Sequence, residues 1–352
     1  MCTSERRQCL GEKEIKCVVW DLDETIWDGT LLESPSVVLK PRVKEVIQTL
    51  DSRGVLHSIA SRNSHEVAMR KLDELGLGGY FLHPQITWNA KSASLARISQ
   101  KLNIAFDALL FIDDQPFERD EVRHHHPDVW CVSASEYERL PSNNRLSPRF
   151  VTEDSRRRRQ MYLDDIHRTQ DEEDCRGPAS EFLASLGMRF FISAATESDL
   201  ERAEELTRRT HQLNATGRTY DYDELNAFRQ SPDHLLLTCK LEDRYGSYGS
   251  VGLALLETKA TYNHLRLMLM SCRVMSRGVG TILLNHLMRL TKSQGKLLLA
   301  DFKPTETNRA MYVSYKFANF VERQTYDDGL ILMQNALDVV PRFPRHVEVV
   351  VA

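Results

Sequence analysis

The segment IKCVVWDLDET, residues 15–25, decides the fold of the first part of the chain. Its apolar, β-branched start predicts a buried strand over residues 15–22, and two carboxylates, Asp21 and Asp23, stand where that strand ends. Similar apolar runs alternate with helical patterns further on: strands are predicted at 55–60, 108–112 and 129–132, and helices at 41–53, 64–75, 92–102 and 116–124. Strands that alternate with helices predict an α/β, Rossmann-like fold with a parallel sheet and right-handed crossovers.

Polar residues follow three of these strands: Asp21 and Asp23, then Ser61, then the pair Asp113–Asp114. Ligands of parallel sheets bind beyond the carboxyl ends of the strands, so we expect these side chains to share a crevice. There, one aspartate can attack phosphorus and the other can move the proton. So many carboxylates repel one another unless a cation is present, and Mg²⁺ prefers oxygen ligands. An Asp-x-Asp pair alone is also compatible with a solvated turn.

The chain changes character after residue 141. Residues 143–186 carry the arginine run 156–159 and the acidic run 171–174, which predicts a charged helical connector. We interpret the arginine run as a solvated helical face, with docking of an acidic carrier protein as the alternative. Predicted strands at 190–192, 234–240, 250–257, 264–271, 297–299 and 328–333, with helices at 197–209, 279–292 and 307–315, indicate an α+β domain with a mixed sheet. The expected domains are therefore 1–142 and 187–352, joined by the connector.

The composition sets limits on function. A chain of 352 residues is long enough for two domains, and its net charge of −4 does not favour a nucleic-acid partner. No apolar run is long enough to span a membrane and the first residues lack an apolar signal core, so we expect a cytoplasmic protein. Seven scattered cysteines without a Cys-x-x-Cys pair predict reduced thiols.

Four motifs in order make residues 15–130 resemble the haloacid dehalogenase superfamily of aspartate-nucleophile phosphatases. Five stretches narrow the resemblance to the FkbH-type proteins of polyketide pathways: KCVVWD (16–21), WDG (27–29), SRN (61–63), WNAK (88–91) and FIDDQPFER (111–119). Those proteins also carry a GNAT-type acyltransferase-like half, so the resemblance covers nearly the whole chain. It implies Asp21 as nucleophile, Asp23 as general acid/base, Ser61, Arg62, Asn63 and Lys91 as substrate or phosphate contacts, and Asp21, Asp23, Asp113 and Asp114 around Mg²⁺.

The second half carries its own motifs. SRGVGT (276–281) precedes a predicted helix, where backbone N–H groups can approach a phosphate, and NRAMY (308–312) resembles the end of a GNAT-type domain. Met275 and Ser276 depart from the usual acetyltransferase loop, which favours a thiol partner on a carrier protein over coenzyme A.

Three residue types in this half suggest acyl-transfer chemistry. Cys272 ends a predicted strand and is a candidate nucleophile, and Arg273 and Arg277 could lower its pKa or hold a phosphate. A buried structural cysteine is the alternative. Cys17 competes for the role from inside the first strand. His211, in RTHQLNAT (209–216), is a candidate base for a thiol or a helix cap.

The resemblance implies transfer of a D-glyceryl group from 1,3-bisphosphoglycerate to the phosphopantetheine thiol of an acyl carrier protein, with removal of phosphate. The product would supply a polyketide or antibiotic pathway with a building block such as a methoxymalonyl or glyceryl-derived unit. The alternatives are a magnesium-dependent phosphatase for a small metabolite without acyl transfer, a non-catalytic carrier-docking protein, and a conventional acetyltransferase. Neither the acylated cysteine nor the order of the steps follows from the sequence.

Overall fold

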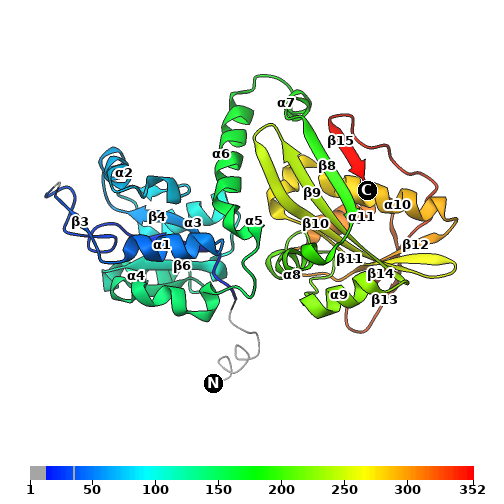
Figure 1. The fold of residues 1–352 in the computed structure, drawn as a ribbon, viewed down its shortest axis with the longest axis horizontal. Helices are drawn as coiled ribbons and strands as arrows, with labels where there is room; N and C mark the ends of the chain where they lie inside the picture. Colours follow the sequence, from blue (N-terminus) through cyan, green and yellow to red (C-terminus); the bar gives the residue numbers. More distant parts are fainter. Residues whose placement is uncertain (1–12, 35) are drawn as a thin grey trace. The chain divides into compact units, whose positions relative to one another are not determined.

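The computed structural model describes residues 13–34 and 36–352, and the chain forms two compact units, Met1–Leu163 and Asp164–Ala352. The division falls inside the range 143–186 and within helix α6 (Arg158–Asp174), whose first residues belong to the first unit and whose last belong to the second (Figure 1). Within the described residues, no helix combines the length and the apolar content needed to cross a membrane.

A five-stranded sheet forms the centre of the first unit, in the order β5-β4-β1-β6-β7. Its neighbouring strands all pair in parallel. The strands are β1 (Cys17–Trp20), β4 (Leu56–Ser61), β5 (Gln85–Ile86), β6 (Leu109–Asp113) and β7 (Trp130–Ser133). Two short strands, β2 (Trp27–Asp28) and β3 (Val38–Leu39), pair separately. Every residue of β1, β4 and β6 is buried, which explains why β1, and β6 up to Asp113, are apolar without interruption.

Helices alternate with the main strands along the first unit. They are α1 (Val43–Ser52), α2 (His65–Glu74), α3 (Lys91–Leu102), α4 (Pro116–His125) and α5 (Glu153–Arg156). Helix α1 buries Val43, Val46, Ile47 and Leu50 because these positions share one helical face. The predicted α/β fold with a parallel sheet is confirmed.

The arginine run differs from the solvated face that we expected. Arg158 is buried, and its Nη1 donates to the carbonyl of Gly54 at 2.8 Å. Arg159 pairs with Asp51 at 2.9 Å and lies over the ring of Tyr80. Two of the four guanidiniums thus hold the end of the first unit onto α1 and the turn after α2, a long-range contact that a run of like charges does not reveal.

The second unit contains an eight-stranded mixed sheet, in the order β13-β14-β12-β11-β10-β9-β8-β15. The strands are β8 (Met188–Ala194), β9 (His234–Asp243), β10 (Gly246–Thr258), β11 (Tyr262–Met270), β12 (Leu297–Phe302), β13 (Val321–Thr325), β14 (Ile331–Asn335) and β15 (Val347–Val351). The helices are α7 (Ala179–Ser185), α8 (Leu200–Arg209), α9 (Tyr222–Gln230), α10 (Val279–Ser293) and α11 (Arg309–Phe317). The predicted mixed sheet is confirmed.

Helices bury both faces of this sheet. Along β10, Ala254 and Leu256 pack with residues of α10, whereas Leu253 and Leu255 pack with residues of α8 and α9. Because side chains alternate along a strand, each face of β10 contributes to a different apolar core.

Candidate active site

Three neighbouring strands of the first unit end in the residues that the sequence singled out. The central strand β1 pairs with β4 and β6, with Trp20 opposite both Ile59 and Ile112. The backbone N–H of Asp21 continues this ladder and donates to the carbonyl of Ile112 at 2.9 Å. Asp21 and Asp113 therefore lie side by side at the carboxyl edge of the sheet, and buried Ser61 ends β4 on the other side of β1.

Lys91 joins the two aspartates. It is the first residue of α3, and its buried Nζ donates to Asp113 Oδ2 at 3.0 Å, to the carbonyl of Ala60 at 2.8 Å, and to Asp21 Oδ1. Burial opposes the charge on Lys91, but Asp21 and Asp113 outweigh it and hold the pKa of Lys91 above its usual value. Burial, together with the negative charge of Asp21, raises the pKa of Asp113 to about 6 against the opposing effect of Lys91.

The carboxylates of Asp21, Asp113 and Asp114 fit a divalent cation. Each offers an oxygen, and these atoms lie within 4.8 Å of one another. Asp114 Oδ1 is buried and has no hydrogen-bond partner among the described residues. Burial and the nearby charge of Asp21 raise the pKa of Asp114. Together with Lys91, the three ionised carboxylates leave two formal negative charges, which one Mg²⁺ ion would neutralise.

The side chain of Asp23 lies outside this group of carboxylates, and its expected place among the metal ligands stays a prediction. Its Oδ1 accepts from Trp27 Nε1 at 2.7 Å and from the backbone N–H of Leu31 at 3.1 Å. Its Oδ2 accepts from Asn63 Nδ2 at 3.1 Å. Burial raises the pKa of Asp23, which suits a group that must hold a proton before giving it to a leaving oxygen.

Two residues that were predicted to contact phosphate, Arg62 and Asn63, have partners within the protein. Asn63 is buried between Asp23 and the start of α2, where its Oδ1 accepts from the N–H of Ser64 at 2.8 Å. Arg62 pairs with the buried carboxylate of Glu118 at 3.1 Å, while its own side chain stays 42% exposed. Arg62 therefore remains accessible at the site, whereas Asn63 orients Asp23.

The sequence analysis did not identify the residues that hold the loop containing Asp113 and Asp114. Arg119 Nη1 donates to the carbonyls of Asp113 and Asp114 at 2.7 and 2.8 Å. Thr25 Oγ1 accepts from the N–H of Asp114 at 3.2 Å, and the N–H of Gln115 donates to Asp113 Oδ1 at 2.8 Å. Arg119 ends the stretch FIDDQPFER, but only the folded chain shows its contact.

A groove of about 740 Å³ opens beside Asp114. Its walls are polar and charged, formed by Glu24, Asp28, Lys40, Ser133, Tyr137 and Arg139 among others. The site therefore adjoins a space that suits polar ligands.

In the second unit, a gap opens where β11 and β12 diverge. The two strands pair in parallel only over 262–265 and 297–300. Beyond that point Ala215 lies between them: its N–H donates to the carbonyl of Met268 and its carbonyl accepts from the N–H of Lys303, both at 3.0 Å. Asn308, fully buried at the start of α11, holds this segment through the carbonyl of Asn214 at 3.0 Å.

Cys272 and His211 come to the same end of β11. The N–H of Met270 donates to the carbonyl of Leu213 at 2.9 Å, and Asn214 forms an antiparallel bridge with Leu269. The pairing ends there, because residues 212 and 213 form a turn and the N–H of Ser271 donates to the carbonyl of Val251. Cys272 is half-buried and starts a 3₁₀ turn, and His211 is exposed.

Cys17, the other candidate thiol, lies in a different environment from Cys272. Cys17 is fully buried inside β1, its sulfur 3.7 Å from the carbonyl oxygen of Val18. Burial raises the pKa of Cys17, which suppresses the thiolate that a nucleophile needs.

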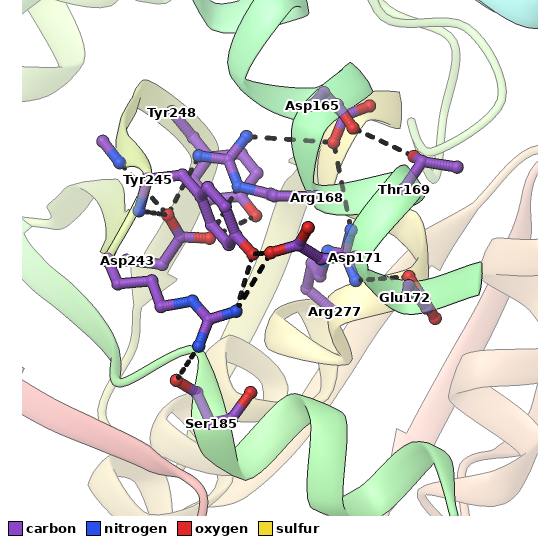
Figure 2. A network of polar contacts seen from close by, with 12 residues as sticks. Asp165, Arg168, Thr169, Asp171, Glu172, Ser185, Asp243, Tyr245, Tyr248 and Arg277 are labelled. Carbon is purple, nitrogen blue, oxygen red and sulfur yellow. Dashed lines mark hydrogen bonds and ion pairs between the residues drawn. The ribbon is translucent and has the colours of Figure 1, made fainter. Parts of the chain in front are cut away.

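Of the two arginines expected near Cys272, Arg273 is half-buried, and Arg277 is buried against α6. Arg277 pairs with Glu172 at 3.2 Å and lies 3.9 Å from Asp165 (Figure 2). A phosphate would have to compete with these carboxylates for Arg277.

A second buried arginine shares this network. Arg168 of α6 binds Asp243 through two hydrogen bonds of 2.7 and 3.0 Å, and its guanidinium lies 3.9 Å from the ring centre of Tyr248 (Figure 2). Tyr248 Oη also donates to Asp243 at 2.9 Å. Both Arg168 and Asp243 are almost wholly buried, so this pair holds the second half of α6 to β9 and β10.

Comparison with known proteins finds similarity to parts of the chain. No protein-family model matches the chain. The N-terminal part of a Bacteroides fragilis protein, which contains a phosphatase domain and was solved in complex with Mg, is 28% identical over 36% of this chain, with a TM-score of 0.31. The chain spans 39% of that structure. The GNAT domain of PAT from S. lividans is 16% identical, with a TM-score of 0.33, over 41% of this chain and 88% of that one.

One curated relative is human magnesium-dependent phosphatase 1. The chain is 34% identical to it in an alignment of 119 residues, and the match covers 28% of this chain and 68% of the relative. With more than two thirds of that relative covered at this identity, the chain belongs to the magnesium-dependent phosphatase 1 family.

Proposed function

We propose that the protein is an FkbH-like bifunctional enzyme that transfers a D-glyceryl group from 1,3-bisphosphoglycerate to the phosphopantetheine thiol of an acyl carrier protein and removes the second phosphate. The observation that carries the phosphatase half is the buried cluster of Asp21, Lys91, Asp113 and Asp114 at the carboxyl edge of the sheet. A solvated turn would have no need of a buried lysine and a buried, unpartnered carboxylate oxygen.

Each phosphatase residue has its own role in the reaction. Asp21 attacks phosphorus, the bond from phosphorus to the ester oxygen breaks, and Asp23 gives that oxygen its proton. Asp23 then takes a proton from the water that hydrolyses the aspartyl-phosphate. Lys91 and Ser61 stabilise the charge on the transferring group. Bound by Asp21, Asp113 and Asp114, Mg²⁺ would supply positive charge for the phosphoryl oxygens.

The acyl half of the proposal rests on Cys272. An acyl phosphate is already activated, so a thiolate can attack its carbonyl carbon, forming a C–S bond and releasing phosphate. His211 reaches the same end of β11 and can take the thiol proton. The carrier thiol then displaces Cys272 from the thioester. Because Ala215 occupies the gap between β11 and β12, we place the acyl group at the open end of β11.

Intact-protein mass spectrometry tests this function. Incubation with 1,3-bisphosphoglycerate, Mg²⁺ and carrier protein should add a glyceryl mass to the carrier. Cys272→Ala should abolish the adduct, and Cys17→Ala should retain it. Asp21→Asn should leave a phosphoglyceryl mass in its place. The absence of any adduct on enzyme and carrier alike would contradict the proposal.

A magnesium-dependent phosphatase without acyl transfer is the alternative. The observation in its favour is that a curated relative, 34% identical over 119 residues, is a magnesium-dependent phosphatase. Phosphate release from small metabolites, with no acylated protein under any condition, would establish it.

A further inference from the structure

The backbone at the start of α10 leaves room for a phosphate group. Gly278 caps this helix in the left-handed conformation, with a φ of 70°. Apart from its chain neighbours, no atom of the described residues lies within 4 Å of the position that a Cβ would take at Gly278. The N–H groups of Val279 and Gly280 follow in the first turn, where a helix offers no acceptor of its own. Side-chain bulk therefore does not block this helix end.

The charges beside this helix end are already matched within the protein. Arg277, which precedes Gly278, is 3% exposed; its Nη1 donates to Glu172 at 3.2 Å, and its Nη2 lies 3.9 Å from Asp165. The positive charge of Arg273, in the same 3₁₀ turn, also acts on Asp165. Two cations of the turn thus face two carboxylates of α6, and their formal charges cancel.

Buried contacts hold the acidic part of α6 in this position (Figure 2). Arg168, three residues after Asp165, binds Asp243 through two hydrogen bonds and lies over the ring of Tyr248. Tyr245 Oη donates to Asp171, the residue before Glu172. Glu172 and Asp165 cannot move far from Arg277 unless these contacts break, so their negative charge stays beside the start of α10.

This arrangement does not fit the ligand that the GNAT resemblance implies. A diphosphate seated at residues 276–281 would gain the N–H groups of α10, but it would have to replace Glu172 and Asp165 at Arg277. Both carboxylates would then repel it from short range, and like charges placed side by side are a common device for rejecting a ligand. We infer that Glu172 and Asp165 take the place of phosphate at Arg277 and exclude coenzyme A from the second unit.

The inference goes beyond the proposed function. It concerns a cofactor that the second unit rejects, and it holds whatever acyl group the enzyme transfers. It also explains why a helix end with an accessible backbone lacks the positive charge that usually accompanies a phosphate site.

Isothermal titration calorimetry of the full chain with coenzyme A tests the inference. Glu172→Gln keeps the size of the side chain and removes its charge, so it should bind coenzyme A about tenfold more tightly than the wild type at low salt. Asp165→Asn should act in the same direction with a smaller gain, because Asp165 lies further from Arg277. Added salt should shrink both gains. Glu173→Gln, at an exposed neighbour on the same helix, makes the same change of net charge and should bind as weakly as the wild type.

Two results would overturn the inference. One is a wild type that already binds coenzyme A as tightly as Glu172→Gln does. The other is a Glu172→Gln variant that binds no more tightly than Glu173→Gln while its unfolding curve matches that of the wild type. Loading of a carrier protein by the wild type is a separate measurement, so its failure would overturn the proposed function and leave the inference standing.

Discussion

Lys91 Nζ lies 3.0 Å from Asp113 Oδ2 across the carboxyl edge of the first sheet, with both side chains buried. The same ammonium also donates to Asp21, so Lys91 holds together two carboxylates that would otherwise repel. The pair therefore contributes to stability as well as to chemistry, and the two effects can be measured separately.

Lys91→Met should destabilise the metal-free protein by about 3–5 kcal/mol, because removing one member of a buried ion pair leaves the other charge uncompensated. Mg²⁺ should raise the Tm of this variant more than that of the wild type, because the cation replaces the lost charge. Denaturation with EDTA and with Mg²⁺ measures both effects. Lys71→Met, which removes an exposed pair with Glu74, is the control and should behave like the wild type. Equal Mg²⁺ shifts in the two variants would contradict this role of Lys91.

Asp114→Asn should weaken Mg²⁺ binding by about ten- to a hundredfold while the fold is retained, because the buried Oδ1 of Asp114 is an unused oxygen within the cluster. Isothermal titration calorimetry of the metal-free protein measures the affinity. Asp120→Asn, at a carboxylate that is 70% exposed, serves as the control. Unaltered affinity in Asp114→Asn would exclude Asp114 as a ligand.

Asn63→Ala should slow phosphate release by about ten- to a hundredfold, because Asn63 Nδ2 fixes the oxygen of Asp23 that does not contact Trp27. The loss should be larger for an alkyl phosphate than for p-nitrophenyl phosphate, whose leaving oxygen needs little protonation. A comparison of kcat for the two substrates measures this difference. The same loss on both would mean that Asn63 acts on the fold and not on proton transfer.

Alkylation should distinguish the two candidate nucleophiles. In the native protein at pH 8–9, iodoacetamide should modify Cys272 and leave Cys17 intact, because burial keeps the pKa of Cys17 far above this range and its sulfur away from solvent. Peptide mass mapping identifies the labelled thiols, exposed Cys175 provides a positive control, and denatured protein should label at Cys17 as well. Rapid labelling of Cys17 in the native protein would make it a candidate nucleophile again.

Arg168→Met should cost the second unit about 3–5 kcal/mol of unfolding free energy, because it leaves the carboxylate of Asp243 buried without its bidentate partner. The double variant Arg168→Met, Asp243→Leu should cost less than Arg168→Met alone. Chemical denaturation followed by a probe in the second unit measures both. Arg189→Ala, which breaks the exposed pair with Glu348, should cost about 0–1 kcal/mol.

Much of the first unit could be predicted from the sequence. The runs before Asp21 and Asp113 are apolar without interruption, as expected of strands buried on both faces, and parallel topology brings their ends together. The placement of Asp21, Ser61 and Asp113 at one edge required only that rule. Lys91 could be predicted from its motif, although its contact with both aspartates depends on where α3 begins.

The contacts of Asp23 could not be predicted in the same way. Asn63 reaches it from a different strand end, and Trp27 reaches it through a turn, so both depend on the folded backbone. The contact of Arg158 could not be predicted either. A run of charged residues suggests exposure to solvent, and only the folded chain brings the carbonyl of Gly54 to the Arg158 guanidinium.

Some helices and strands of the second unit were not predicted from the sequence, and physical reasons explain why. Every residue of β13 is exposed, so no apolar alternation marks it, and β15 pairs in parallel with β8, which is far from it in the sequence. Helix α9 did carry a signal, since Asp221 and Glu224 form a capping box three residues apart. The insertion of Ala215 between β11 and β12 joins distant segments and has no local pattern.

The ammonium of Lys91 also has a consequence for how the protein meets its metal. A site whose charge is partly balanced from within can be assembled during folding before any ion arrives, unlike a structural zinc centre, which its protein needs in order to fold. Metal ions can then enter and leave a finished site. The active fraction of the enzyme would follow the concentration of free Mg²⁺. Removal of Mg²⁺ would inactivate the enzyme reversibly, and the protein would stay folded and protected from degradation.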